Sequence, residues 1–194
     1  MLKPKEALDR IIEGNRRFAQ GKSIHPNLGE ELRNSLIYGQ KPFAAVLACS
    51  DSRVPVEIIL DMGLGDIFVV RNAGNTLSNS VTGSLEYAVK TLGVKLIMIL
   101  GHNDCGAVKE ALDIYNNYQA ENLTHCLKEI FDCILPSITQ SDKEALNDII
   151  KLNTKNQAEK LVKESSYLAQ KLKDNKIMIV SANYCLATRL IEVL

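Results

Sequence analysis

Three residues of the chain combine side-chain types that bind a transition metal. Cys49 opens the sequence Cys-Ser-Asp-Ser-Arg, and His102 and Cys105 stand in Gly-His-Asn-Asp-Cys-Gly. Both segments come directly after short apolar runs. Thiolate sulfur and imidazole nitrogen favour Zn²⁺ over Mg²⁺ or Ca²⁺. The residue types in this pattern therefore predict a zinc site held by Cys49, His102 and Cys105.

Three protein ligands would leave the fourth tetrahedral position of the zinc to water, which distinguishes catalytic zinc sites from closed structural ones. A zinc-bound water loses its proton far more readily than free water, so it provides hydroxide near neutral pH. Two thiolates neutralise the dication more fully than neutral imidazoles would. We therefore expect a less acidic water than on an all-histidine zinc, and activity that rises into alkaline pH.

Two charged residues near the first cysteine, Asp51 and Arg53, decide whether the fourth position stays open. The Asp51 carboxylate, two residues after Cys49, could itself bind the zinc and close the site. The Arg53 guanidinium can instead hold that carboxylate in a bidentate, charge-assisted pair. Asp51 would then accept a hydrogen bond from the zinc-bound water, orient it and relay its proton. Asp51 and Arg53 would then act together on the zinc-bound water.

Each of these residues also has a simpler interpretation. A single cysteine at the end of an apolar strand is more often a buried core residue than a ligand. Asp51 and Arg53 alone would more often be a loop ion pair. The joint pattern of Cys49 with His-x-x-Cys favours the metal site. Cys126 and Cys133, seven residues apart, share a predicted helix face with apolar side chains, and we expect both in the core.

Length and composition restrict the class of protein. The 194 residues are 46% apolar, as expected of one globular domain with its own core. Lys plus Arg and Asp plus Glu both number 23, so no positive surplus points to nucleic acid or an anionic membrane. No apolar run approaches the roughly 18 residues of a membrane span. Five cysteines, an odd number, behind an N-terminus without a secretory pattern lead us to expect reduced thiols and a cytoplasmic protein.

The two ligand segments need a scaffold that brings them together. Short aliphatic and β-branched runs, bounded by polar residues or glycine, are typical of buried parallel strands. Such runs span Phe43–Ala48, Ile67–Val70, Leu96–Leu100 and Ile177–Val180. A helical pattern between the second and third runs ends at Gly93 and predicts a right-handed β-α-β crossover. Because ligands bind at the carboxyl ends of parallel strands, the two segments would converge there if the first and third strands are neighbours in the sheet.

Helices account for most of the remaining sequence. An amphipathic pattern from Lys5 to about Gln20 opens an N-terminal helical arm of about residues 1–36. In the segment after Cys105, we expect one helix to end at Pro136. Two more helices should span Glu144–Ile150 and Gln157–Leu172.

The tail predicts a strand to Tyr184 and a short hairpin partner within Thr188–Leu194. The fold class predicted is a single α/β domain over residues 1–194. Its central sheet would have about four parallel strands and a C-terminal antiparallel edge strand, with flanking helices.

Three motifs taken together resemble the signature of the β-class carbonic anhydrases. They are Cys-Ser-Asp-Ser-Arg-Val from Cys49, Arg-Asn-Ala-Gly-Asn from Arg71, and Gly-His-Asn-Asp-Cys-Gly from Gly101, in the family's order and at its usual separation. The resemblance covers nearly the whole chain. It implies one zinc ion per chain on Cys49, His102 and Cys105, with reversible hydration of CO2 to bicarbonate and a proton by zinc-bound hydroxide. It also implies that Asp51 and Arg53 are the catalytic pair.

The resemblance also implies how the substrate is held and how chains assemble. By position, the residues that match the family's substrate pocket are Gln40, Phe68, Ala73, Tyr87 and Gly106. Part of that pocket comes from a neighbouring subunit, which implies a homodimer or a dimer of dimers with sites at the interface. CO2 and bicarbonate would be the small-molecule partners, with no nucleic acid and no membrane.

Two other functions fit the same motifs. The scaffold could act on a related linear molecule, such as carbon disulfide or carbonyl sulfide, because the same nucleophile attacks any such electrophilic carbon. A long, narrow apolar tunnel would favour that substrate. Alternatively, the zinc could be structural and permanently closed by Asp51, in a protein without catalytic activity. Arg53 argues against closure, because it can hold the carboxylate away from the metal.

Overall fold

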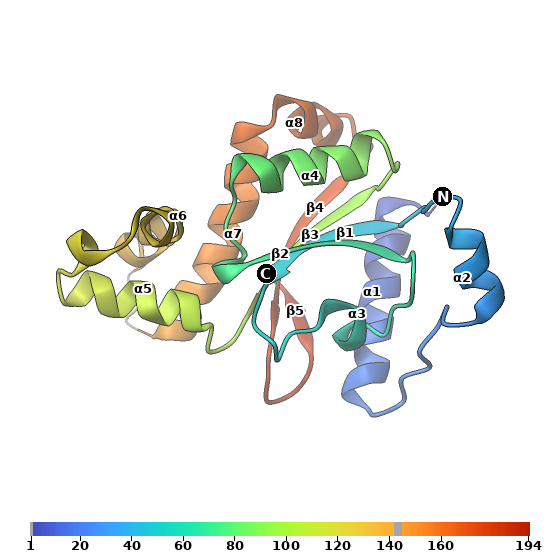
Figure 1. Ribbon diagram of the computed structural model, residues 1–194, viewed down its shortest axis with the longest axis horizontal. Coiled ribbons are helices and arrows are strands. Elements are labelled where there is room, and N and C mark those ends of the chain that lie inside the picture. Colours follow the sequence, from blue (N-terminus) through green and yellow to red (C-terminus); the bar gives the residue numbers. More distant parts are fainter. Residues whose placement is uncertain (1, 142–144) are drawn as a thin grey trace.

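The computed structural model describes residues 2–141 and 145–194 and shows one α/β domain around a central sheet (Figure 1). The elements in chain order are α1 (Pro4–Ala19), α2 (Glu30–Leu36), β1 (Ala44–Cys49), α3 (Val56–Ile59), β2 (Ile67–Asn72), the 3-10 turn η1 (Ala73–Asn75), α4 (Asn79–Lys90), β3 (Leu96–His102), α5 (Gly106–Asn116), the 3-10 turn η2 (Ala120–Asn122), α6 (His125–Thr139), α7 (Leu146–Glu164), α8 (Ser166–Lys173), β4 (Met178–Tyr184) and β5 (Ile191–Val193).

The sheet has the strand order β2-β1-β3-β4-β5. The first four strands run parallel, and β5 pairs antiparallel with β4 at the edge. Every residue of β1 and β3 is buried, as expected for parallel strands covered on both faces. The predicted fold class is confirmed, and β1 and β3 extend to include the two candidate ligands Cys49 and His102.

Helices cover both faces of this sheet (Figure 1). On one face, α1 and α3 pack against Ala44, Val46 and Ala48 of β1. On the other face, α4, α7 and α8 pack against Ala45 and Leu47. The alternation follows from the two-residue period of a strand, which sends successive side chains to opposite faces. Both faces are therefore apolar, and polar chemistry is confined to the strand ends.

A third apolar cluster lies at the carboxyl ends of the strands, where α5, α6 and the start of α7 meet Cys49 and Cys105. In Figure 1, α5 and α6 project from the end of the sheet. The chain leaves β1 toward β2 on one side, while β3 lies on the other, so a topological switch point separates β1 and β3. The parallel register pairs Ala48 with Leu100 and so brings both ligand segments to this crevice.

Two helix boundaries predicted from the sequence are wrong. α6 does not end at Pro136 but continues to Thr139. Proline disturbs the turn before it, but its own carbonyl still accepts a backbone hydrogen bond, from Gln140 at 3.0 Å, so the last turn forms. The residues expected as two helices form one long helix, α7, and a break at Ser165 starts α8. The predicted start at Glu144 lies outside the described residues.

The middle of α7 escaped prediction because its buried face is polar. Asn153, Thr154 and Gln157 are at most 1% exposed. Helix α7 also approaches the sheet closely at Gly101, where a Cβ atom would lie 2.1 Å from the Thr154 hydroxyl oxygen. Glycine at this position therefore allows α7 to pack directly against β3, one residue before His102.

Two cysteines expected in the core differ from each other. Cys126 is exposed, so that prediction is wrong: the first turn of α6 points it to solvent. Cys133 is half-buried, and its sulfur lies 3.4 Å from the Leu77 carbonyl oxygen. Neither belongs to a metal-ligating cluster among the described residues.

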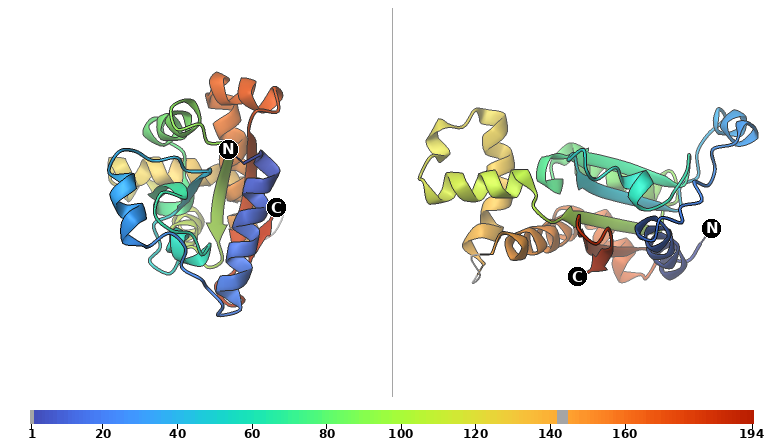
Figure 2. Two further views of the ribbon diagram at one scale, coloured as in Figure 1. Left: turned by 90° about the vertical axis from the view of Figure 1, so that its right-hand side faces the viewer. Right: turned by 90° about the horizontal axis from the view of Figure 1, so that it is seen from below.

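The N-terminal arm is fastened to the rest of the chain by a buried carboxylate, Asp61, whose side chain is fully buried. Arg17 donates to it at 2.6 Å, and the backbone N–H groups of Ile24 and His25 donate at 3.1 and 3.0 Å. Beyond this anchor, α2 buries none of its residues, and it stands apart from the sheet (Figure 2). No helix among the described residues is long and apolar enough to cross a membrane.

We predict that Asp61→Asn destabilises the protein in a pH-dependent way. Burial works to raise the pKa of Asp61, but the hydrogen bonds from Arg17, Ile24 and His25 hold the pKa below its ordinary 3.8. A carboxylate with a lowered folded-state pKa stabilises the fold at neutral pH and loses that contribution as the pH falls through this pKa. The variant should lose about 2 kcal/mol at neutral pH, because buried donors are left poorly paired.

Urea unfolding at fixed protein concentration, at about pH 7 and about pH 3.5, measures this difference. The gap between wild type and variant should narrow at the lower pH. Asp9→Asn is the control, because Asp9 pairs with Lys5 on the exposed surface of α1 and should change stability by at most about 0.5 kcal/mol. An equal gap at both pH values would contradict the role of the Asp61 charge.

Candidate metal centre

The three predicted ligands meet at the switch point of the sheet. Cys49 ends β1, His102 ends β3, and Cys105 directly precedes α5. Their ligating atoms all lie within 4.8 Å of one another, and the two sulfurs are 3.9 Å apart. All three side chains are buried. The predicted juxtaposition of Cys49, His102 and Cys105 is therefore confirmed.

His102 presents one ring nitrogen to this cluster and uses the other to fix its orientation. Its Nδ1 lies 2.9 Å from the carbonyl oxygen of Asn103, which only accepts hydrogen bonds, so Nδ1 carries the proton. The buried Nε2 has no hydrogen-bond partner. A buried nitrogen with a free lone pair beside two sulfurs suits a metal ligand held by an outer hydrogen bond. The donor set fits Zn²⁺.

The environment of the two sulfurs favours a cation between them. A hydrogen bond from the Cys105 thiol lowers the pKa of Cys49 to about 4, against the effect of burial. The hydrogen bond to the Cys49 sulfur, followed by burial, raises the pKa of Cys105. The two thiols therefore share a proton: the pair loses one proton readily, and the second leaves when a metal ion takes its place.

Asp51 and Arg53 form the expected bidentate pair beside the cluster. The guanidinium donates from Nε to Oδ1 at 3.0 Å and from Nη2 to Oδ2 at 2.8 Å, and the Arg53 backbone N–H also donates to Oδ1. These hydrogen bonds lower the pKa of Asp51 to about 2, so it is anionic. Oδ2 lies 3.8 Å from Nε2 of His102. Because Arg53 engages both carboxylate oxygens, this geometry favours an open metal position over one closed by Asp51.

Sequence reasoning assigned no separate role to Arg71, which supports the loop that carries both a ligand and the carboxylate. Its Nε donates to the Cys49 carbonyl at 3.0 Å, and its Nη2 donates to the Asp51 carbonyl at 2.8 Å. The register of the sheet pairs Arg71 with Ala48, which brings it level with this loop. A signal was available, because Arg71 opens the second of the three motifs.

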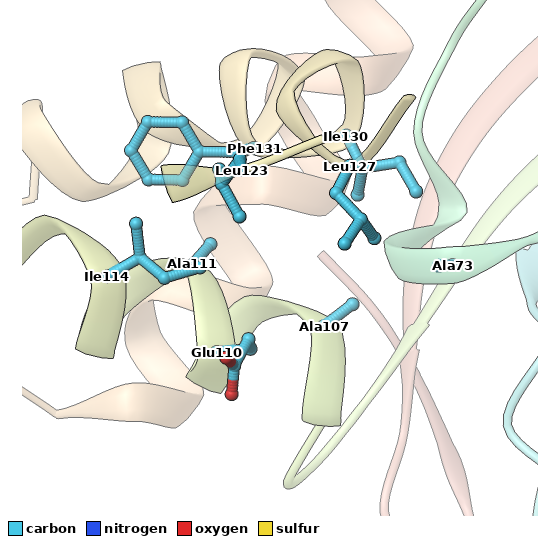
Figure 3. A pocket seen from close by; sticks show the side chains of 9 residues that line it. All are labelled: Ala73, Ala107, Glu110, Ala111, Ile114, Leu123, Leu127, Ile130 and Phe131. Carbon is cyan, nitrogen blue, oxygen red and sulfur yellow. The ribbon is translucent and has the colours of Figure 1, made fainter. Parts of the chain in front are cut away.

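An apolar pocket of about 240 Å³ opens between α5 and α6 (Figure 3). Of the predicted substrate residues, Ala73 lines it, and Gly106 directly precedes another lining residue, Ala107. Leu127 and Ile130 point into the pocket from α6, opposite Ala107 (Figure 3). The polar member of the lining is Glu110. The pocket thus offers an apolar surface to a small, uncharged molecule, although none of the three ligands lines it.

The other predicted substrate residues lie elsewhere in the chain. Gln40 is exposed and precedes β1, at the opposite end of this strand from Cys49. Phe68 lies level with Ala45 in the sheet, four residues before the strand end and so roughly 13 Å from it. Tyr87 is 47% exposed, and its ring centroid is 6.2 Å from that of Phe68. Within one chain these three residues do not join the ligand cluster.

Comparisons with known proteins point to one family. A family model described as carbonic anhydrase matches residues 44–191. A carbonic anhydrase of Mycolicibacterium smegmatis is 40% identical over 192 residues, covering 97% of this chain and 92% of that protein.

Solved structures agree as well. The β-carbonic anhydrase CcaA superposes with a TM-score of 0.70 at 25% identity, over 96% of this chain and 94% of that one. A structure described as tetrameric β-carbonic anhydrases from Sordaria macrospora superposes with a TM-score of 0.65 at 25% identity, over 96% of both chains. With the family model over most of its length and a close relative over nearly all of it, this chain belongs to the β-carbonic anhydrase family.

Proposed function

We propose that the chain catalyses the reversible hydration of CO2 to bicarbonate and a proton, with one zinc ion on Cys49, His102 and Cys105. The observation that carries this proposal is the set of three buried ligand atoms within 4.8 Å of one another, faced by the Asp51–Arg53 pair. Membership of the β-carbonic anhydrase family supports it.

In this proposal each part of the site has a physical task. Zinc, when bound, makes a water acidic enough to provide hydroxide near neutral pH. Asp51 accepts a hydrogen bond from the reacting water, orients it and passes its proton toward solvent. Arg53 keeps Asp51 ionised and off the metal. The apolar surface beside Ala73 and Ala107 holds CO2, which has no charge to be desolvated, whereas charged bicarbonate is released.

We also propose that the active assembly is a homodimer or a dimer of dimers, in which the N-terminal arm of residues 1–36 and the segment after it reach a second subunit. Ile37 and Tyr38, next to Gln40, are 76% and 93% exposed, and large exposed apolar side chains in one region mark contact surfaces. A partner subunit's Gln40, Phe68 and Tyr87 would then complete the pocket. The tetrameric relatives support this assembly.

We also propose a cytoplasmic location, because free thiols are typical of a reducing compartment.

Zinc-loaded protein should hydrate CO2 rapidly, at a rate that increases from about pH 6.5 to about pH 9, the range around the ionisation of a zinc-bound water. Stopped-flow measurement with a pH indicator tests this, and metal analysis gives the zinc content. Cys49→Ser should lose zinc and activity together, because one of three ligands becomes a weak one. Protein with one zinc per chain and no hydration at any pH would refute the proposed function, and hydrolysis of carbon disulfide by that protein would favour the rival substrate.

Asp51→Asn should keep zinc but lose about 100-fold in hydration rate, as expected when a proton acceptor is removed. The amide cannot take the proton, and it also weakens the pairing with Arg53. The same stopped-flow assay, with zinc content measured in parallel, tests this. Asp113→Asn, at an exposed position of α5, is the control and should keep the wild-type rate. Full activity of Asp51→Asn would exclude the proposed catalytic pair.

Mixing two inactive variants tests the shared site. Gln40→Ala and Cys49→Ser should each be nearly inactive alone. If Gln40 acts in the partner's site, each mixed dimer contains one intact site, so random mixing should restore about a quarter of the wild-type activity. The two variants are unfolded and refolded together, and each one treated alone serves as the control. No recovery in a verified mixed dimer would show that Gln40 does not act across the interface.

A further inference from the structure

The loop between His102 and Cys105 is held in an unusual backbone conformation. Asp104 has φ +55°, in the left-handed region that residues other than glycine rarely adopt. This conformation turns the chain so that His102 and Cys105 face the same point. A loop with an unfavourable backbone angle keeps its shape only if surrounding groups hold it. The groups that hold Asp104 are therefore candidates for residues that position the ligands.

Both sides of the Asp104 backbone are engaged by side chains. Its N–H donates to Oδ1 of Asn147, in the first turn of α7, at 3.1 Å. Its carbonyl accepts a hydrogen bond from Nη2 of Arg53 at 3.2 Å. One contact thus comes from the proposed catalytic pair, and the other comes from a helix to which no role in the site has been assigned.

A second residue of α7 holds the turn η1, which packs against the start of α5. Asn153, only 1% exposed, donates from Nδ2 to the carbonyl of Gly74 at 3.1 Å. Gly74 has φ +70°, and a Cβ atom there would contact the Cβ of Ala107 at 3.4 Å, so η1 lies directly against the start of α5. The Asn153 side chain is itself fixed, because its Oδ1 accepts a hydrogen bond from Gln157 at 3.0 Å.

We propose that Asn147 and Asn153 are positioning residues for the metal centre, through which α7 holds the His102–Cys105 loop and the Gly74 turn in the ligating arrangement. This inference rests on the proposed zinc site but not on the reaction that the site performs. Without the side-chain amide of Asn147 or of Asn153, the ligating conformation of the loops has a higher free energy. Zinc should therefore bind more weakly and with altered geometry.

The test uses full-length Asn147→Ala and Asn153→Ala, with Asn156→Ala as the matched control. Asn156 is also an asparagine of α7, but it donates to Ser137 and Gln140, away from the ligand loops. Zinc affinity is measured by competition with a chelator, and site geometry by the absorption spectrum of Co²⁺-substituted protein. The two variants should bind zinc about 10- to 100-fold more weakly, the usual cost of losing an outer hydrogen bond. Asn156→Ala should stay within about twofold, a change below the range of outer-shell effects.

A conservative replacement separates positioning from general loss of stability. Asn147→Asp keeps an acceptor oxygen for the Asp104 N–H and should recover most of the zinc affinity and the wild-type Co²⁺ spectrum. Asn147 is only half-buried, so its variants remain informative even if Asn153→Ala fails to fold. Zinc affinity and Co²⁺ spectra of Asn147→Ala equal to wild type, or an Asn147→Asp variant as weak as Asn147→Ala, would overturn the proposal. Wild type that binds zinc without hydrating CO2 would refute only the proposed function.

Discussion

Two sulfurs held 3.9 Å apart in a buried site set the main physical constraint on this protein. If both were ionised with nothing between them, their repulsion would cost about 4 kcal/mol at an effective dielectric constant of about 20. A dication removes that cost and also satisfies the free lone pair of His102. The fold must supply the other half of the arrangement, a rigid frame that keeps three ligands together before the metal arrives. Parallel strands that end side by side at a switch point provide this frame.

Charges around the ligands are arranged in shells. Arg53 neutralises Asp51, and Arg71 binds the carbonyl groups on both sides of the same loop. Neither guanidinium donates to a ligand sulfur, so the thiolates remain available to the metal. The two arginines thus bind a carboxylate and backbone carbonyl groups. The negative charge of the thiolates is left for zinc to neutralise.

Much of this arrangement could be predicted from the sequence. The ligands and the Asp51–Arg53 pair were identifiable because cysteine, histidine and paired charges at strand ends have few common roles. The apolar runs predicted where the strands lie along the chain, but not their order in the sheet. Helix α7 could not be predicted as one helix, because Asn153 and Gln157 face inward to bond with loops and break the apolar period. The exposure of Cys126 depends on how α6 rotates against α5, and in the proposed assembly the surroundings of Gln40 depend on a second chain. Neither depends on local pattern.

The missing side chain at Gly101 has a consequence for engineering this fold. Most buried positions tolerate exchanges among apolar residues of similar volume, and such exchanges are the usual route to a more heat-resistant variant. Position 101 does not tolerate such exchanges. Even one methyl group there would clash with Thr154 and push α7 away from β3. A library that varies core positions should therefore leave Gly101 unchanged. A larger residue there would displace the neighbouring ligand His102, so its variants would lose zinc as well as packing.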